Sequence, residues 1–238
     1  MNPIDIQNST IAFARENRKR IAKELTDRAV YPQDLLPVSV FMAGSPGAGK
    51  TEFSKNFIME IFRENLDRGV IRIDGDELRS LFPGYTGNNS YLFQGAVALI
   101  VEKVHDFVLA QKQSFILDGT FSNYEKAVQN VRRSLAKGRA VFIFYIYQNP
   151  KIAWEFTQKR EEVEGRNIPK KEFIEHFLNA QETVNQIRKE FGVNVAIYLV
   201  KKEYKNMVQE IAKIEPHSQQ VDEFVGERYT KNELHALL

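Results

Sequence analysis

The residues best suited to chemistry form a glycine-rich segment, GSPGAGKT, at positions 44–51. Its spacing is that of a phosphate-binding loop, in which a glycine is followed after four residues by Gly-Lys and then Ser or Thr. Such a loop points successive backbone N–H groups at a triphosphate, and the start of the next helix adds partial positive charge. We therefore predict that the chain binds ATP or GTP together with Mg²⁺. The predicted binding residues are Gly44, Ser45, Pro46, Gly47, Ala48, Gly49, Lys50, Thr51 and Glu52, with Lys50 on the β- and γ-phosphates and Thr51 on the metal.

Three carboxylates that follow apolar runs could act on a phosphoryl acceptor. Asp74 and Asp76 flank Gly75, and Asp118 stands in the segment LDGT. Phosphoryl transfer needs a group that orients or deprotonates the acceptor, and acids near the metal. An Asp-Gly-Asp sequence alone is typical of a turn, but carboxylates at the ends of two strands of one sheet favour a functional site. These patterns leave open whether Asp74 or Asp76 is the base.

A charged segment at 159–173, KREEVEGRNIPKKEF, supplies two arginines that could contact phosphate groups. Arg160 and Arg166 would belong to a lid and neutralise charge on the γ-phosphate oxygens. The alternative is pairing with the neighbouring glutamates at the surface, which contributes little to stability. The histidines at 105, 176, 217 and 235 lack the spacing of metal ligands, so we interpret them as bystanders.

The elements that must position these residues alternate along the chain. Apolar runs at 37–44, 69–76, 114–120, 139–148 and 194–200 are predicted as strands, and stretches with helical spacing separate them. This alternation predicts an α/β fold of the P-loop kinase type, with a parallel five-stranded sheet covered by helices on both faces. We predict an N-terminal helical segment at 1–36 with a helix at 3–28. The core would span 37–205 with a helical lid at about 155–173, and a helical tail at 206–238 would pack on or near it.

Composition excludes several classes of protein. The 33 basic and 31 acidic side chains leave a formal charge of +2, so neither a nucleic-acid nor a membrane partner is indicated. The basic run at 15–20 is interpreted as a solvated helix face. Cysteine is absent, which excludes disulfides and thiolate metal sites. We find no secretory signal and no apolar run long enough to span a bilayer, and we expect a cytoplasmic protein.

Together these motifs resemble the zeta-toxin family of P-loop kinases over most of residues 38–200. The resemblance rests on the phosphate loop, on IDGDELRSLFPGY at 73–85, on Glu102 ahead of the LDGT acid, on DGT at 118–120 and on the charged segment at 159–173. The chain departs from the family on the acceptor side. Asp118 stands where the family commonly has Glu, and Phe82-Pro83 stands in place of a His-Pro pair.

The resemblance implies a kinase that phosphorylates a hydroxyl of a UDP-activated amino sugar such as UDP-N-acetylglucosamine and is held inactive by an antitoxin protein. It implies that Asp76 is the base and that Lys50, Arg160 and Arg166 bind the phosphates. The implied substrate-binding residues are Asp74, Glu102, Asp118 and Thr120. The N-terminal helix at 3–28 is a candidate docking site for the antitoxin.

Two alternatives to this function stay open. The chain could be a P-loop kinase for another acceptor, such as a nucleotide, a nucleic-acid end or a small alcohol. A polynucleotide acceptor would favour a basic stripe with aromatic residues, and the run at 15–20 lies outside the predicted core. The chain could also be a nucleotide-dependent regulatory module, but such a switch needs a water-positioning glutamine, for which the sequence offers no clear candidate.

Overall fold

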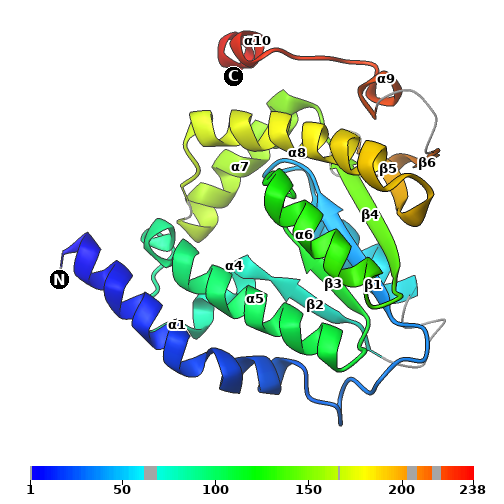
Figure 1. Cartoon of the computed structure of the whole chain (residues 1–238). Coiled ribbons are helices and arrows are strands. Elements are labelled where there is room, and N and C mark those ends of the chain that lie inside the picture. The colour runs from blue at the N-terminus through cyan, green and yellow to red at the C-terminus, as the bar shows by residue number, and fades with distance from the viewer. Residues whose placement is uncertain (1, 62–68, 166, 203–207, 216–220) are drawn as a thin grey trace.

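The computed structural model describes residues 2–61, 69–165, 167–202, 208–215 and 221–238. Its centre is a six-stranded sheet with the strand order β2-β3-β1-β4-β5-β6 (Figure 1). The strands are β1 (Val38–Ala43), β2 (Ile71–Asp74), β3 (Phe115–Asp118), β4 (Ala140–Tyr147), β5 (Ala196–Lys202) and β6 (Val208–Ile214). The first five run parallel, as predicted.

The sixth strand differs from the sequence prediction, which placed a helical tail at 206–238. β6 pairs antiparallel with β5 at the edge of the sheet. Ile214 of β6 is buried whereas Ile211 is largely exposed, so one face of this strand contributes to the core. The segment forms a strand because β5 offers an unpaired edge, and that tertiary context outweighs the weak local preference of a short polar segment.

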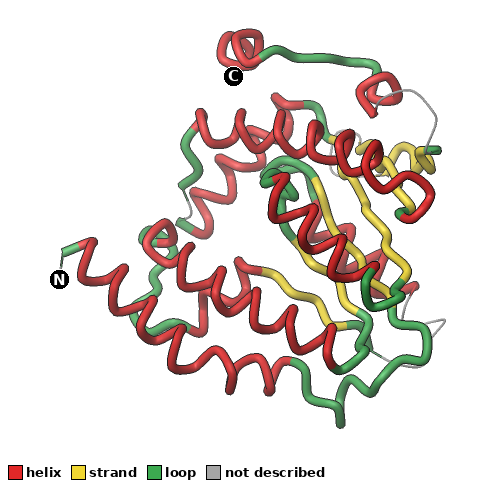
Figure 2. Tube along the Cα trace, in the orientation of Figure 1, coloured by secondary structure: helices red, strands yellow, loops and turns green. Residues whose placement is uncertain are grey.

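Most of the helices lie on one face of the sheet, and Figure 2 shows them in front of the strands. The longer ones are α1 (Pro3–Leu25), α5 (Gln94–Ala110), α6 (Tyr124–Leu135), α7 (Pro150–Glu164) and α8 (Lys170–Phe191). Shorter elements are α2 (Lys50–Phe53), the π-helix η1 (Ser54–Ile58), α4 (Gly75–Leu78), η2 (Arg79–Leu81), η3 (Ser90–Phe93), η4 (Gly192–Asn194), α9 (Val221–Val225) and α10 (Lys231–Leu237). α5 contacts β2, α6 contacts β4 and α8 contacts β1, and α1 packs along α5 (Figure 1). None of the helices in the described ranges combines the length and apolar character needed to cross a bilayer.

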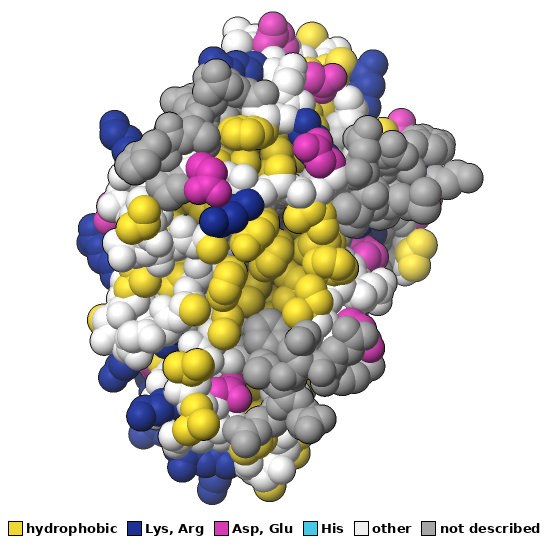
Figure 3. Space-filling view, turned by 90° about the vertical axis from the view of Figure 1, so that its right-hand side faces the viewer, with side chains coloured by type: hydrophobic (Ala, Val, Ile, Leu, Met, Phe, Trp, Pro, Cys, Tyr) yellow, Lys and Arg dark blue, Asp and Glu magenta, His cyan; other side chains and the backbone are white. Residues whose placement is uncertain are grey.

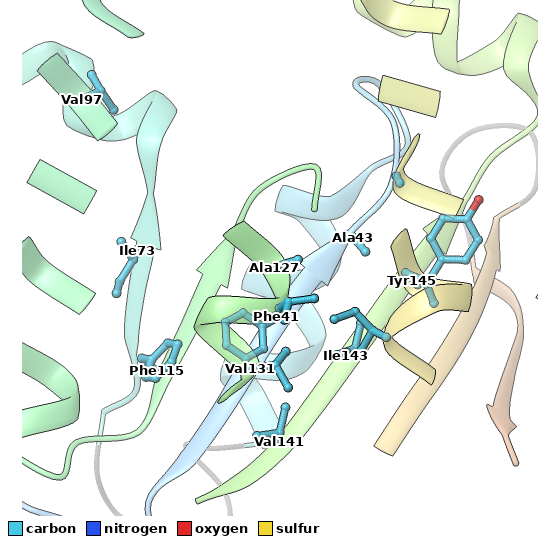
Figure 4. Close-up of a cluster of buried hydrophobic side chains, with 14 of the residues drawn as sticks. Phe41, Ala43, Ile73, Val97, Phe115, Ala127, Val131, Val141, Ile143 and Tyr145 are labelled. Atoms are coloured by element: carbon cyan, nitrogen blue, oxygen red, sulfur yellow. The ribbon is translucent and has the colours of Figure 1, made fainter. Parts of the chain in front are cut away.

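The core lies between the sheet and these helices. Alternate residues of the central strands, including Phe41, Ile143 and Tyr145, point to this side and are almost fully buried (Figure 4). Val131 of α6 packs against them from the helical layer. Apolar residues that alternate in the strands and those at helical spacing in α6 therefore pack in the same buried cluster, which holds the carboxyl ends of the strands in place.

The second face of the sheet carries α2 and η1, whose Phe53 and Ile58 pack on Val40 of β1. The aromatic rings of Phe144 and Tyr198 stack on this face with centroids 5.1 Å apart and are only half-buried. Figure 3 shows hydrophobic side chains gathered over a broad area on the side of the molecule where β5 and β6 lie.

The C-terminal segment packs on α8. Leu234 of α10 is fully buried, and the Lys170 Nζ at the start of α8 donates a hydrogen bond of 2.9 Å to the His235 carbonyl. Lys231 and Glu175 form an ion pair of 3.2 Å between the same two helices. These contacts hold α10 against α8.

Candidate active site

The glycine-rich segment forms a tight loop between β1 and α2. Gly44 and Gly47 have φ angles of 138° and 70°, which L residues with a side chain rarely adopt. A Cβ atom at Gly47 would collide with the Ala153 carbonyl of α7, and one at Gly44 would collide with the Ile146 carbonyl of β4. Glycine is therefore required here both by backbone conformation and by close packing.

Two lysines bond to carbonyl groups of this loop from different sides. The Lys50 Nζ donates to the carbonyls of Ser45 at 2.7 Å and Gly44 at 3.1 Å, which places the ammonium group over the loop. From β5, the buried Lys202 Nζ donates to the Gly49 carbonyl at 3.3 Å. Burial lowers the pKa of Lys202, against the opposite effect of Glu52. The loop is thus supported from behind by a residue that sequence reasoning missed.

A cavity of about 490 Å³ opens beside the loop at the carboxyl ends of β1, β2 and β3. It brings together most of the predicted site residues. The predicted residues that line it are Pro46, Gly47, Gly49, Lys50, Thr51, Glu52, Asp74, Asp76, Asp118, Thr120 and Arg160. Glu102 of α5 is exposed and lies outside the lining of this cavity and of the second one described below. Arg166 lies outside the described residues.

Arg72 of β2 binds two of the predicted carboxylates. Asp74 and Asp118 stand opposite each other in the register of β2 and β3. Arg72 forms ion pairs with both, at 2.5 Å to Asp118 Oδ2, and Ser54 donates to the same oxygen at 2.9 Å. All three charged side chains are nearly buried, with exposures of 5%, 8% and 4% for Arg72, Asp74 and Asp118. The two acids are therefore held together by a shared cation, because side by side they would otherwise repel each other.

The pKa shifts reflect this arrangement. Burial alone would lower the pKa of Arg72, but the charges of Asp118 and Asp74 outweigh it and raise that pKa. Burial raises the pKa of Asp74, and the charge of Asp118 raises it further, against the opposite effect of Arg72. Glu77 also pairs with Arg72, at 2.8 Å.

Asp76 is the more accessible of the two acids in the Asp-Gly-Asp turn. Its side chain is 33% exposed, and Oδ1 accepts a hydrogen bond of 2.7 Å from the buried Arg79. Its backbone N–H donates to Asp74 Oδ1 at 2.8 Å, which caps α4. Asp74 thus fixes the backbone of the turn, while the Asp76 carboxylate faces the cavity.

A second cavity of about 490 Å³ adjoins the first. It is lined mainly by polar side chains, among them Arg79, Asn88, Gln94 and Glu172. Four of the described residues line both cavities, namely Pro46, Thr120, Ile168 and His176. The two cavities therefore share a wall, and a molecule in the second one would lie next to the phosphate loop.

The end of α7 closes against this second cavity. Arg160 of α7 lines the first cavity. α7 ends at Glu164 and is capped by Gly165, whose φ is 70° and whose Cβ, if present, would collide with the Asn88 side chain. Described residues of the charged segment at 159–173 therefore line both cavities, and Gly165 lies against Asn88.

Several residues of the site were not predicted from the sequence. Arg72 had a detectable signal, because an arginine between Ile71 and Ile73 in a buried strand requires a buried anion. Arg79 and His176 had none, since their partners come together only through the fold.

The sheet order, the phosphate loop between β1 and α2 and the carboxylates at the ends of the next strands define a P-loop fold of the phosphotransferase class. A family model described as Zeta toxin matches residues 21–215. The chain belongs to the zeta toxin family and is a nucleotide-dependent, kinase-like toxin. This confirms the resemblance found in the sequence.

Solved structures share this fold. The PezAT chromosomal toxin–antitoxin system of Streptococcus pneumoniae contains a chain that is 17% identical, with a TM-score of 0.68, and the alignment covers 98% of this chain and 94% of that one. A complex of AvrRxo1-ORF1 and AvrRxo1-ORF2 with sulphate ions has a chain that is 12% identical, with a TM-score of 0.62, covering 93% and 71%. An AvrRxo1 complex with ATP is 14% identical, with a TM-score of 0.61, covering 93% and 70%. A comparison with curated protein sequences finds no match.

Proposed function

We propose that the chain transfers the γ-phosphoryl group of ATP or GTP to a hydroxyl of a UDP-activated amino sugar such as UDP-N-acetylglucosamine. One observation carries the proposal: the accessible Asp76 carboxylate lines the same cavity as Lys50 and the phosphate loop, next to a second polar cavity. A donor site, a base and room for an acceptor therefore adjoin one another.

The chemistry assigned to each residue follows from its place. The loop N–H groups and Lys50 bind the triphosphate, and Asp76 accepts the proton of the acceptor hydroxyl. As the acceptor oxygen bonds to the γ-phosphorus, the bond to the β–γ bridging oxygen breaks and the nucleoside diphosphate leaves. Arg160, and Arg166 by the resemblance, would neutralise the charge on the transferring group.

The residues present also fit Mg²⁺. The Thr51 hydroxyl lines the cavity together with the Asp74 and Asp118 carboxylates, and Mg²⁺ prefers such hard oxygen ligands. Thr51 would hold the ion beside the phosphates, where it supplies charge neutralisation. The described residues contain no group of three or more acids or histidines that could hold a metal by themselves, so phosphate oxygens would complete the coordination.

The hydrogen bonds that the Asp118 carboxylate accepts favour a second class of acceptor. The resemblance assigns this acid to the UDP-sugar, yet its carboxylate accepts from Arg72 and Ser54. A nucleotide, a nucleic-acid end or a small alcohol would not need that carboxylate. Incubation with ATP, Mg²⁺ and a panel of UDP-sugars, nucleotides, RNA ends and small alcohols tests the choice. Phosphorylation of other acceptors and of no UDP-sugar would overturn the first assignment in favour of the second.

The donor half has a separate test. Lys50→Ala should abolish transfer to every acceptor, because the ammonium group is assigned to contact the β- and γ-phosphates. Lys137→Ala, at an exposed position beyond α6, is the matched control and should retain full activity. Transfer by Lys50→Ala at the rate of the control would contradict the assignment of the phosphate loop.

We further propose an antitoxin partner, because the similar PezAT structure is described as a toxin–antitoxin system. The N-terminal helix is the candidate docking site. Its inner face, with Ala14, Ile21 and Ala22, is buried in the core, so only its outer face would be available. The double variant Arg15→Glu/Lys19→Glu changes that face at two exposed positions. Loss of a stoichiometric partner on purification of this variant is the expected result, and an unchanged complex would exclude the helix.

A further inference from the structure

The loop at 119–123, between β3 and α6, holds a strained residue. Phe121 has a φ of 59°, a conformation that costs energy for a residue with a side chain unless its surroundings hold it. The Phe121 ring packs on Phe41 with centroids 5.9 Å apart. The left-handed turn at Phe121 brings the hydroxyls of Thr120 and Ser122 within 2.8 Å of each other.

A histidine of α8 extends this pair into a chain of hydrogen bonds. His176 Nδ1 lies 2.7 Å from Ser122 Oγ, and its Nε2 lies 3.4 Å from Glu172 Oε1. The Thr120 carbonyl accepts from the Gly44 N–H at 3.1 Å. A continuous polar path therefore runs from α8 through the loop at 119–123 to the phosphate loop.

This path lies on the wall shared by the two cavities. Thr120 and His176 each line both cavities, and they are the polar side chains among the four described residues that do so. The position of the Thr120 hydroxyl at the junction therefore depends on Ser122, and that of Ser122 depends on His176. A loop with a strained residue would shift once this support is removed.

We propose that His176 is a positioning residue for the acceptor: through Ser122 it holds the Thr120 hydroxyl at the junction of the two cavities, where the acceptor binds. The inference rests on the proposed function, in which Thr120 contacts the acceptor. It gives a role to a histidine whose spacing in the sequence indicates none. Its effect should fall on the acceptor and spare the nucleotide.

The atom that bonds to Ser122 permits a matched set of variants. An asparagine places its amide where Nδ1 stands, whereas a glutamine reaches toward the Nε2 position. His176→Asn should therefore retain the bond to Ser122, and His176→Gln and Ser122→Ala should both lose it. His235→Gln is the control, since that side chain is exposed on α10.

Steady-state kinetics with ATP and the UDP-sugar that the wild type phosphorylates then test the proposal. We expect His176→Gln and Ser122→Ala each to raise the acceptor KM about 3- to 10-fold, the range for one lost neutral hydrogen bond. The KM for ATP should stay unchanged, and His176→Asn should restore the acceptor KM. The double variant Ser122→Ala/His176→Gln should be no worse than either single one, because both break the same chain.

Three results would overturn this inference while wild-type transfer persists. The first is an unchanged acceptor KM in both His176→Gln and Ser122→Ala. The second is an equal rise of the acceptor KM in His176→Asn and His176→Gln. The third is an equal rise of the KM for the acceptor and the KM for ATP, which would indicate that His176 supports the phosphate loop instead. Thermal denaturation of each variant checks that it folds as the wild type does. If the wild type transfers phosphate to none of the acceptors, the proposed function is overturned and this inference with it.

Discussion

Replacement of Arg72 by methionine tests the buried charge cluster most directly. The substitution removes the cation that Asp74 and Asp118 share and leaves two carboxylates of 8% and 4% exposure next to each other. Removing one partner of a buried ion pair costs about 3–5 kcal/mol, because a charge remains without compensation. In a chain of this length that loss lowers the melting temperature by roughly 6–20 °C.

The loss should depend on pH in a defined direction. The pKa of Asp74 is already raised in the folded protein by burial and by Asp118, with Arg72 opposing the rise. Without Arg72 the folded pKa rises further, so the folded state binds protons more readily than the unfolded chain. Stability is then retained below the pKa that Asp74 has in the unfolded chain, and it is lost as the pH rises through the pKa of Asp74 in the folded protein. Arg72→Met should be more destabilised at pH 7 than at pH 5.

Urea denaturation followed by circular dichroism at both pH values measures this effect. Arg132→Met is the matched control, since Arg132 pairs with Glu190 at the surface and is 64% exposed, and it should change stability far less. Adding Asp118→Asn to Arg72→Met should recover part of the loss at pH 7. The reasoning would be refuted by a loss below about 1 kcal/mol at pH 7, or by one that is equal at the two pH values.

Three further predictions concern the site itself. Asp76→Asn should lower kcat about 10²- to 10⁴-fold while ATP still binds by calorimetry; a deeper loss of kcat in Asp74→Asn, with its fold intact, would reverse the assignment of the base. Gly47→Ala should abolish ATP binding in the same titration, because its Cβ collides with the Ala153 carbonyl, and normal affinity would contradict the tight loop. Glu102→Gln should leave the acceptor KM unchanged, since Glu102 lies outside both cavity linings; a severalfold rise would restore the role that the resemblance implies.

The phosphate loop can be recognised from the sequence for a physical reason. The phosphate loop is local: its glycines, Lys50 and Thr51 lie within eight consecutive residues, so the spacing alone specifies the geometry. The five parallel strands are equally visible, because each is a short run rich in apolar residues, most of which are buried. The structure confirms the parallel strands and shows the glycine-rich segment as a tight loop between β1 and α2.

The residues proposed to act on the acceptor side depend on contacts between distant segments and are harder to predict. Arg72 meets Asp118 only because β2 and β3 pair with Asp74 opposite Asp118. His176 meets Ser122 across 54 positions of the chain. Neither the register of two strands nor the rotation of α8 follows from composition or periodicity. Hydrogen-bond chains of this kind become visible only once the fold is known.

The close approach of Gly165 to Asn88 limits how the family can vary around this site. Gly165 follows α7, Asn88 lines the second cavity, and a Cβ atom at position 165 would collide with the Asn88 side chain. In relatives with the same backbone, a side chain at position 165 should therefore occur only together with a smaller residue at position 88, and at the cost of a strained φ. Position 165 should therefore change through a paired exchange with position 88 rather than through a single one, because a single enlargement at position 165 has no space to occupy.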